Sequence, residues 1–292
     1  MKRCLNCGHE FEAADWICPA CGFTPESRGG FVSFAPSLAA QNDGFDPELF
    51  RRYAQVEAGN FWFVARNALL KKLLLRHFPR AGRVLEIGCG TGFVLANIRA
   101  TYPQAALYGS DIFIEGLGFA QQRVPSATLF QMDATAIPFR AEFNLIGAFD
   151  VLEHIDDDAT ALAQIHAACK PGGGVVFTVP QHPSLWSRMD EYAHHKRRYT
   201  RAELLAKMRN AGFHVRYATS FVSLLLPVMW LSRVLQRNAP PVDDGMDPDL
   251  KIHPLVNALF GGVMALERGL LALGMRFPAG GSLLVVAEKA GE

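Results

Sequence analysis

The stretch RVLEIGCGTG, residues 83–92, decides the fold class of this 292-residue chain. Val84 to Ile87 predict a short buried strand, and glycines follow it at positions 88, 90 and 92. A glycine loop between a strand and a helix is a ligand site in α/β folds, because backbone without side chains lets the ligand come close. Phe93 stands where the dinucleotide fingerprint needs glycine, and the Gly-Lys-Ser/Thr of a P-loop is absent. The loop therefore predicts a ligand of another kind.

From residue 83 onward, short apolar segments alternate with helical stretches. This alternation is typical of βαβ units. It predicts an α/β, doubly wound, Rossmann-like fold with a mostly parallel, seven-stranded sheet whose last strand is antiparallel. A helical pattern from Asp46 to Pro79 precedes the sheet, and a helical insert over about residues 221–280 precedes the last strand. The predicted strands are residues 83–87, 106–109, 127–131, 145–149, 174–179, 213–219 and 282–287.

Two cysteine pairs stand near the N-terminus, and a glycine that permits a tight turn follows each pair. Two Cys-x2-Cys units present four thiolates, the set that tetrahedral Zn²⁺ requires. Four such ligands leave no open position for water, so we predict a structural zinc ribbon over residues 1–28 and a linker over residues 29–45. Iron or a redox dithiol is the alternative. The expected metal ligands are Cys4, Cys7, Cys18 and Cys21.

Charge and hydropathy limit the partners of the chain. The formal net charge is +1, from 29 Lys and Arg against 28 Asp and Glu. Because this balance gives no overall attraction to polyanions, DNA is not expected and RNA is disfavoured. The N-terminus lacks the apolar core of a signal peptide, which favours a cytoplasmic protein. The apolar runs 221–231 and 252–277 are short or interrupted, and neither is expected to span a membrane.

The sequence VLEIGCGTG resembles motif I of class I S-adenosylmethionine-dependent methyltransferases, and the order of the other segments agrees over about residues 46–292. The resemblance implies S-adenosylmethionine as the cofactor. Glu86, Gly88, Gly90 and Gly92 would border its methionine part, Asp111 would accept from the ribose hydroxyls, Asp133 and Ala134 would lie beside the adenine, and Phe149 with Asp150 would line the donor pocket. The alternative is that the carboxylates of Glu86, Asp111 and Asp133 only cap strand ends.

Four further segments, FWFVARNALL, GAFDVLEHI, VPQHPSLW and DEYAHHKRRYTRAELL, resemble a bacterial methyltransferase group (type 11/12-like) found in cell-envelope glycan and lipid contexts. This group carries a His-x-Arg-Arg-Tyr arrangement, which residues 195–199 match. His195 is therefore the first candidate for a general base, since histidine titrates near neutrality. His154, just beyond the fourth strand, is the second. The alternatives are a solvated basic turn, a loop anchor formed by Arg198 and Tyr199, and a packing role for His154.

These features predict an O-methyltransferase for a small-molecule, glycan or lipid-linked acceptor. A ribosomal RNA methyltransferase with a zinc module and a non-catalytic scaffold are the alternatives, and AFDVLEH lacks the Asp/Asn-Pro-Pro-Tyr expected for DNA amino-group methylation. Two apolar inserts flank a polar connection at residues 238–249. They predict a lid for a lipidic acceptor or a peripheral contact at the inner face of the membrane. The alternative is packing against the sheet or against a partner subunit in a homodimer. At least one of Phe61, Trp62 and Phe63 is expected to face a pocket or a neighbouring element, because adjacent residues cannot share one helical face.

Overall fold

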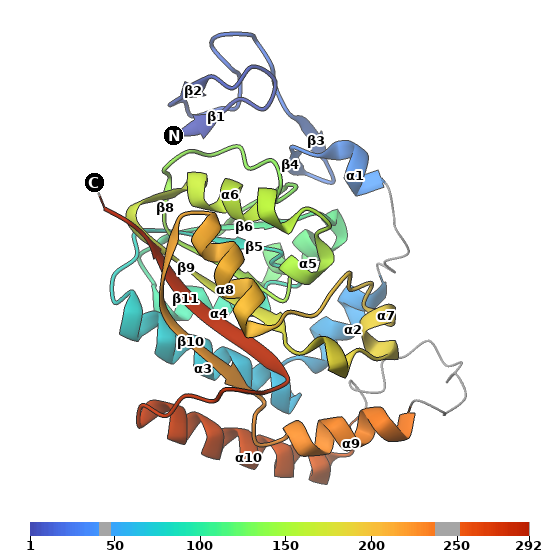
Figure 1. Ribbon diagram of the computed structural model, residues 1–292. Helices are drawn as coiled ribbons and strands as arrows, with labels where there is room; N and C mark the ends of the chain where they lie inside the picture. Colours follow the sequence, from blue (N-terminus) through green and yellow to red (C-terminus); the bar gives the residue numbers. More distant parts are fainter. Residues whose placement is uncertain (41–47, 237–251, 292) are drawn as a thin grey trace.

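The computed structural model describes residues 1–40, 48–236 and 252–291. Within these ranges a nine-stranded sheet is covered by helices (Figure 1). The N-terminal segment of the chain forms a separate, small two-stranded sheet. The predicted helix start at Asp46 and the polar connection at residues 238–249 lie outside the described residues.

The large sheet contains all the predicted strands and two more at one edge. Its order is β10-β11-β9-β8-β5-β6-β7-β4-β3, and β11 runs antiparallel between β10 and β9. The prediction of a doubly wound, mostly parallel sheet with an antiparallel last strand is confirmed. The bounds of the predicted strands are β5 (Arg83–Ile87), β6 (Ala106–Asp111), β7 (Thr128–Gln131), β8 (Phe143–Phe149), β9 (Cys169–Pro180), β10 (Phe213–Phe221) and β11 (Ser282–Lys289).

The segment predicted as a linker, residues 29–45, instead contributes to the sheet. It carries β4 (Phe31–Ser33) and the short helix α1 (Pro36–Ala40), and β4 pairs in parallel with β7. The hairpin partner β3 (Glu26–Arg28) comes from the end of the predicted ribbon. The prediction of a linker over residues 29–45 and the prediction of seven strands are both wrong, and the reason is physical. Strands of three residues are too short to show alternation, and β4 is held by non-local contacts such as the 2.7 Å hydrogen bond from Ser33 to the side chain of Gln131.

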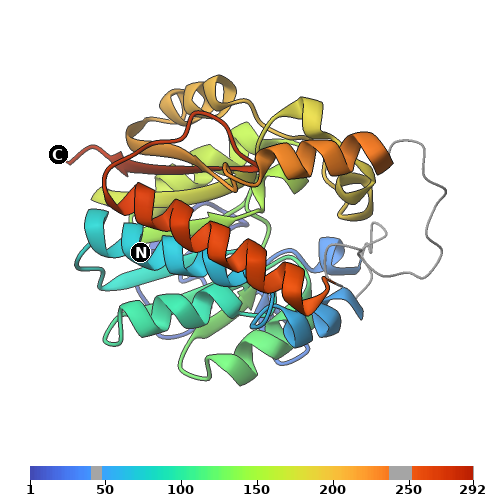
Figure 2. The ribbon, with the colours of Figure 1, turned by 90° about the horizontal axis from the view of Figure 1, so that it is seen from below.

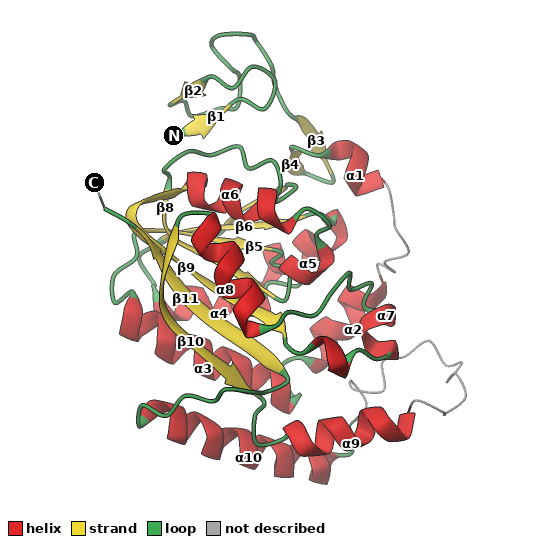
Figure 3. Ribbon diagram, in the orientation of Figure 1, coloured by secondary structure: helices red, strands yellow, loops and turns green. Residues whose placement is uncertain are grey.

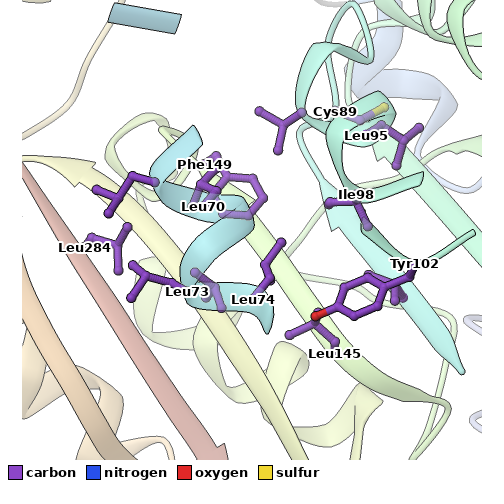
Figure 4. Packing of buried hydrophobic residues seen from close by; sticks show 14 of the residues in the cluster. Leu70, Leu73, Leu74, Cys89, Leu95, Ile98, Tyr102, Leu145, Phe149 and Leu284 are labelled. Carbon is purple, nitrogen blue, oxygen red and sulfur yellow. The ribbon is translucent and has the colours of Figure 1, made fainter. Parts of the chain in front are cut away.

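Alternate strand residues point to opposite faces of the sheet and build two hydrophobic cores. Figure 3 shows the helices on both sides of the strands. In one core, Leu70 and Leu74 of α3 and Leu95 of α4 pack with Leu145 and Leu284 of the sheet (Figure 4). Helices α6 and α8 pack on the opposite face. The bounds of these helices and of α5 are α3 (Phe61–His77), α4 (Phe93–Thr101), α5 (Ile114–Arg123), α6 (Asp158–Ala168) and α8 (Arg201–Asn210).

The helical pattern before the first strand is divided into two helices. α2 (Glu48–Val56) ends before Gly59, and α3 begins after Asn60. The Asn60 side chain caps α3, because its Oδ1 accepts a hydrogen bond from the Trp62 N–H at 2.9 Å. The break places three aromatic residues in the first turn of α3.

Helices α9 (Leu226–Gln236) and α10 (Pro254–Ala272) form the insert before β11, and α10 packs beside α3 (Figure 2). Asn257 joins the two helices: its Oδ1 accepts from the Phe61 N–H at 2.8 Å, and its Nδ2 donates to the Gly59 carbonyl at 2.9 Å. Contrary to the expectation from sequence, α10 is long and apolar enough to cross a membrane by length and composition alone. Only 17% of its apolar window is buried in the fold.

The N-terminal ribbon contains β1 (Lys2–Arg3) and β2 (Glu10–Phe11) and docks on the large sheet. The Trp16 ring contacts Phe34 and Phe139 edge to face, with centroid distances of 4.5 and 5.4 Å. The Arg3 N–H also donates to the Pro138 carbonyl at 2.9 Å. The ribbon is therefore packed against the domain and does not hang from a free tether.

Candidate active site

A cavity of about 1040 Å³ opens at the C-terminal ends of β5, β6, β7 and β8. Ligands bind at this end of a doubly wound sheet, because the loops there diverge and leave a crevice. The volume is at the upper end of the ~300–1,000 Å³ range of ligand pockets, so it has room for a cofactor and an acceptor together. The lining includes nearly all of the residues predicted for the cofactor and both candidate histidines.

Glu86, at the end of β5, is a buried carboxylate without an internal partner on one oxygen. Its residue is 2% exposed, and Oε2 accepts no hydrogen bond from the described residues. Burial raises the pKa of Glu86 well above its usual value, although the positive charge of Arg66 opposes the shift. An unsatisfied buried acceptor calls for a donor from a ligand, and the ammonium group of a methionine moiety is of that kind.

Asp111, at the end of β6, connects the glycine loop to the neighbouring loop. Its Oδ2 accepts from the Gly90 N–H at 2.8 Å, and its Oδ1 accepts from the Phe113 N–H at 3.0 Å. Burial raises the pKa of Asp111 to about 6, while these amides oppose the shift. A carboxylate has about four acceptor positions, so Asp111 can still accept from hydroxyl donors such as those of a ribose.

The three loop glycines have different surroundings. Gly88 (φ 66°) lines the cavity, and a Cβ there would lie 2.4 Å from Val151 Cγ2. Gly90 (φ 49°) also lines the cavity. Gly92 (φ 75°) does not, because it begins α4 where a Cβ would meet the Ala120 Cα at 2.8 Å. Gly92 is therefore required for close packing of α4 on α5.

The remaining predicted cofactor residues, Asp133, Ala134, Phe149 and Asp150, all line the cavity. The Asp133 carboxylate accepts from the Thr135 N–H at 2.8 Å and from the Thr135 hydroxyl. These contacts fix its direction at the end of β7.

Arg66 is a site residue that the sequence did not predict. Its Nη1 donates to Asp150 Oδ2 at 2.5 Å, and its guanidinium lies 4.5 Å from the Trp62 ring centroid. Asp150 has a positive φ of 60°, a strained position for a residue other than glycine. The ion pair holds the end of β8 against the start of α3. No local sequence pattern links these residues, since they stand 84 positions apart.

His195 lies in the cavity wall with its ring held by a buried carboxylate. Its Nδ1 is 2.9 Å from Asp190 Oδ1, and Arg198 Nε donates to the same oxygen at 2.6 Å. Although burial alone would raise the pKa of Asp190, hydrogen bonds from His195 and Arg198 lower it below its usual value. An ionised Asp190 can only accept, so Nδ1 of a neutral His195 carries the proton. Its Nε2 keeps a lone pair and lies 4.0 Å from Glu153 Oε1.

Glu153 and His154 stand beside His195. Glu153 is fully buried, and neither of its oxygens accepts a hydrogen bond within the described part of the chain. The His154 side chain is exposed where it lines the cavity. The protein packed around its ring removes water from it and lowers its pKa, and the charge of His195 lowers the pKa further. Its ring meets that of His195 edge to face at 4.8 Å. Glu153, His154 and His195 bring one ligand atom each within 4.8 Å of the others, a set that could also hold a cation.

Tyr199 and Arg197, the rest of the predicted His-x-Arg-Arg-Tyr arrangement, do not line the cavity. Tyr199 is fully buried, and its hydroxyl donates to Asp158 Oδ2 at 2.6 Å. Arg197 pairs with the same carboxylate at 3.2 Å. The anchoring alternative, made for Arg198 and Tyr199, therefore holds for Tyr199, whereas Arg198 lines the cavity and pairs with Asp190. Tyr199 and Arg197 attach the loop to the start of α6.

The wall of the cavity on the insert side is mostly apolar. Its apolar side chains are Val222, Leu225, Val228 and Met229 around the start of α9 and Phe260 of α10, and Ser232 and Arg233 of α9 add polar groups further along. Phe61, Trp62 and Phe63 line the cavity as well, which confirms that at least one of these aromatics faces a pocket.

The four predicted metal ligands come together in the ribbon, away from the cavity. The Sγ atoms of Cys4 and Cys21 are 3.7 Å apart, those of Cys7 and Cys18 are also 3.7 Å apart, and all four lie within 4.8 Å. Tetrahedral Zn–S bonds of ~2.3 Å require sulfur separations of roughly 3.8 Å. The cluster could therefore bind one zinc ion, and none of its cysteines lines the cavity.

Residues 53–218 match the family model of the methyltransferase domain, and the chain belongs to this family. Trans-aconitate 2-methyltransferase of Azoarcus sp. (strain BH72) is 30% identical over 131 residues, covering 45% of this chain and 49% of that protein. A ubiquinone/menaquinone biosynthesis C-methyltransferase of Desulfotalea psychrophila (strain LSv54 / DSM 12343) is 33% identical over 101 residues, covering 34% of this chain and 41% of that protein. The chain spans about half the length of the curated relatives it matches.

Solved structures share the fold at low sequence identity. Phosphoethanolamine N-methyltransferase 2 of Haemonchus contortus, in complex with S-adenosyl-L-methionine, has a TM-score of 0.57 at 20% identity, covering 89% of this chain and 61% of that chain. A Haloferax volcanii complex of the Trm112 methyltransferase activator and a methyltransferase contains a chain with a TM-score of 0.55 at 19% identity, covering 84% of this chain and 98% of that chain. The family match and the shared fold therefore identify residues 53–218 as a methyltransferase domain, which favours an enzyme over the non-catalytic alternative.

Proposed function

We propose that the enzyme methylates an oxygen atom of an amphipathic, lipid-linked acceptor, with His195 as the general base. The observation that carries the proposal is a single cavity with two unlike walls. One wall presents the carboxylates of Glu86, Asp111 and Asp133, and the other combines the Asp190–His195 pair with the apolar start of α9. A polar acceptor group beside the histidine and an alkyl part against α9 suit this division.

The polar wall fits S-adenosylmethionine, which supplies an electrophilic methyl group on a sulfonium when bound. Glu86 would accept from the ammonium, because its Oε2 has no partner among the described residues. Asp111 would accept from the ribose hydroxyls with the lone pairs that Gly90 and Phe113 leave free. Asp133 and Ala134 would border the adenine.

The proposed role of His195 is to accept the proton of an acceptor hydroxyl at Nε2 as the new oxygen–carbon bond forms. The methyl carbon–sulfur bond would break in the same step, and its electron pair would leave with sulfur as the neutral thioether of S-adenosylhomocysteine. Asp190 keeps the proton of the neutral imidazole on Nδ1 and stabilises the charged imidazole that results. Because methyl transfer is an in-line displacement, positioning supplies much of the acceleration. The aromatic and apolar walls would exclude water from the reacting atoms.

We also propose that Cys4, Cys7, Cys18 and Cys21 bind one structural zinc ion. The support is the fit of the sulfur separations to a tetrahedral site and the two matching turns at Gly8 and Gly22, whose φ values are 76° and 71°. Zinc would fix the ribbon, which docks on the domain through Trp16.

The acceptor class can be tested with radiolabelled S-adenosylmethionine and a bacterial extract divided into lipid and aqueous fractions. We expect label in the lipid fraction with the wild type and with His214→Gln, an exposed histidine outside the cavity. His195→Gln should lose this labelling and keep its affinity for S-adenosylhomocysteine. Label in the aqueous fraction alone would refute a lipid-linked acceptor, and full labelling by His195→Gln would refute the base.

A further inference from the structure

We propose that α9 and α10 form a docking surface for an anionic phospholipid bilayer, with α10 lying in the plane of the headgroups. This inference goes beyond the methyl transfer proposed above, because it concerns a surface outside the cavity and needs no acceptor.

One side of α10 exposes a continuous apolar stripe. Leu255, Leu259, Leu266 and Leu273 recur at helical spacing and are 75, 64, 60 and 86% exposed. The other exposed positions between them are also uncharged and consist of Val256 and the small residues Ala258, Gly262, Ala265, Gly269 and Ala272. A helix face of this kind gains no burial from the fold itself.

Helix α9 adds to the same surface at the lower side of the molecule (Figures 1 and 2). Trp230, Leu231 and Leu235 are 58, 52 and 69% exposed. Most of the exposed large apolar side chains among the described residues lie between Val228 and Met275. Apolar exposure concentrated in one place marks an interaction surface.

The charge around this surface is positive. Among the described residues of α3, α9 and α10 there is one carboxylate, Glu267, and it is fully buried. Its Oε2 accepts from the N–H groups of Ser223 and Leu224 at 2.7 and 2.8 Å, so it contributes no exposed negative charge. Lys71, Lys72 and Arg76 on α3 are exposed and form no ion pair within the described ranges. Apolar side chains bordered by cations are the composition that binds anionic lipid surfaces.

A second copy of the chain fits this surface less well than lipid. In a two-fold dimer the same patch faces itself, so the cations of α3 would approach their equivalents with no exposed carboxylate from these helices to pair with. Anionic headgroups would neutralise those cations and accept the leucines between the acyl chains.

The helix is also fixed in a direction that suits surface contact and not insertion across the bilayer. Asn257 ties the N-terminal turns of α10 to α3, and Met264 and Leu271 are buried in the core further along. The inner faces of these helices supply Met229 and Phe260 to the cavity wall. A docked bilayer would therefore adjoin the apolar side of the cavity.

Flotation of the full chain with phospholipid vesicles tests the surface without any acceptor. We expect wild-type protein to float with vesicles of equal parts phosphatidylcholine and phosphatidylglycerol, and much less with phosphatidylcholine alone. Leu266→Asp should reduce the floating fraction at least about fivefold, because a charge replaces a lipid-facing leucine. Ile17→Asp is the matched control, since Ile17 is 53% exposed on the ribbon and should leave flotation unchanged.

The charge contribution is tested separately with Lys71→Gln/Lys72→Gln, which should weaken binding to the anionic vesicles roughly tenfold or more. These exposed changes should leave the affinity for S-adenosylhomocysteine unchanged, which checks that each variant is folded. Equal flotation of wild type, Leu266→Asp and Lys71→Gln/Lys72→Gln would overturn the proposal. So would a wild-type dimer that Leu266→Asp converts to a monomer, in the absence of any flotation.

Discussion

The imidazole of His195 and the carboxylate of Asp190 lie 2.9 Å apart, and Asp190 has no exposed surface. Arg198 and the backbone N–H of Ser187 donate to the same carboxylate. Together with His195, three residues therefore fix the position of Asp190. A carboxylate held in this way fixes both the tautomer and the orientation of the ring. The pair therefore gives His195 a defined free nitrogen in the wall of the cavity.

We expect His195→Gln to lower kcat by ~10²–10⁴-fold, the usual contribution of a general base. Asp190→Asn should also lower kcat, because an amide no longer stabilises the charged imidazole. Neither variant should change the affinity for S-adenosylhomocysteine, measured by calorimetry. A normal kcat in both variants would exclude the base assignment, with His214→Gln as the matched histidine control.

Affinity for S-adenosylhomocysteine should depend on pH through Asp111. Burial raises the pKa of this carboxyl to about 6 in the free protein. The ribose hydroxyls bind the ionised form, so binding lowers this pKa and releases a proton. Affinity should therefore rise between pH 5 and pH 7, by about tenfold if Asp111 alone is responsible. Calorimetry of Asp111→Asn should lack the step near pH 6, and persistence of the same step would assign it to another group.

Removal of the zinc should leave the cofactor site intact. Elemental analysis of protein prepared without chelator should give one zinc per chain, and Cys4→Ser/Cys7→Ser should lose it. The affinity for S-adenosylhomocysteine should survive in this variant, because the cysteines do not line the cavity. Protein that contains no zinc would disprove the metal assignment.

Glu267→Ala should reduce the free energy of unfolding by ~1–3 kcal/mol, since it leaves the N–H groups of Ser223 and Leu224 without their acceptor. Urea denaturation measures this change. Glu12→Ala, at an exposed position of the ribbon, should stay within about 0.5 kcal/mol of wild type. A similarly small effect at Glu267 would show that the loop before α9 does not depend on this carboxylate.

Much of the fold could be predicted from local patterns. The parallel strands could be predicted because buried strands are short apolar runs between turns. The edge strands β3 and β4 could not be predicted, since three residues carry no period, and the two strands are held by non-local pairing of β4 with β7 and by the pairing of β3 with β4. The helix predicted to end at Pro79 is instead two helices, α2 and α3, because the Asn60 side chain caps the start of α3.

By itself the sequence determined the features that depend on residue type and short spacing: the glycine loop after β5, the two cysteine turns and the carboxylates at strand ends. Tertiary structure alone decided how distant groups are used. It assigned Gly92 to helix packing, joined Arg66 to Asp150, buried Tyr199 as an anchor and left the leucines of α10 exposed. The reason is physical: turn geometry is local, whereas burial and the pairing of charges depend on which segments the folded chain brings together.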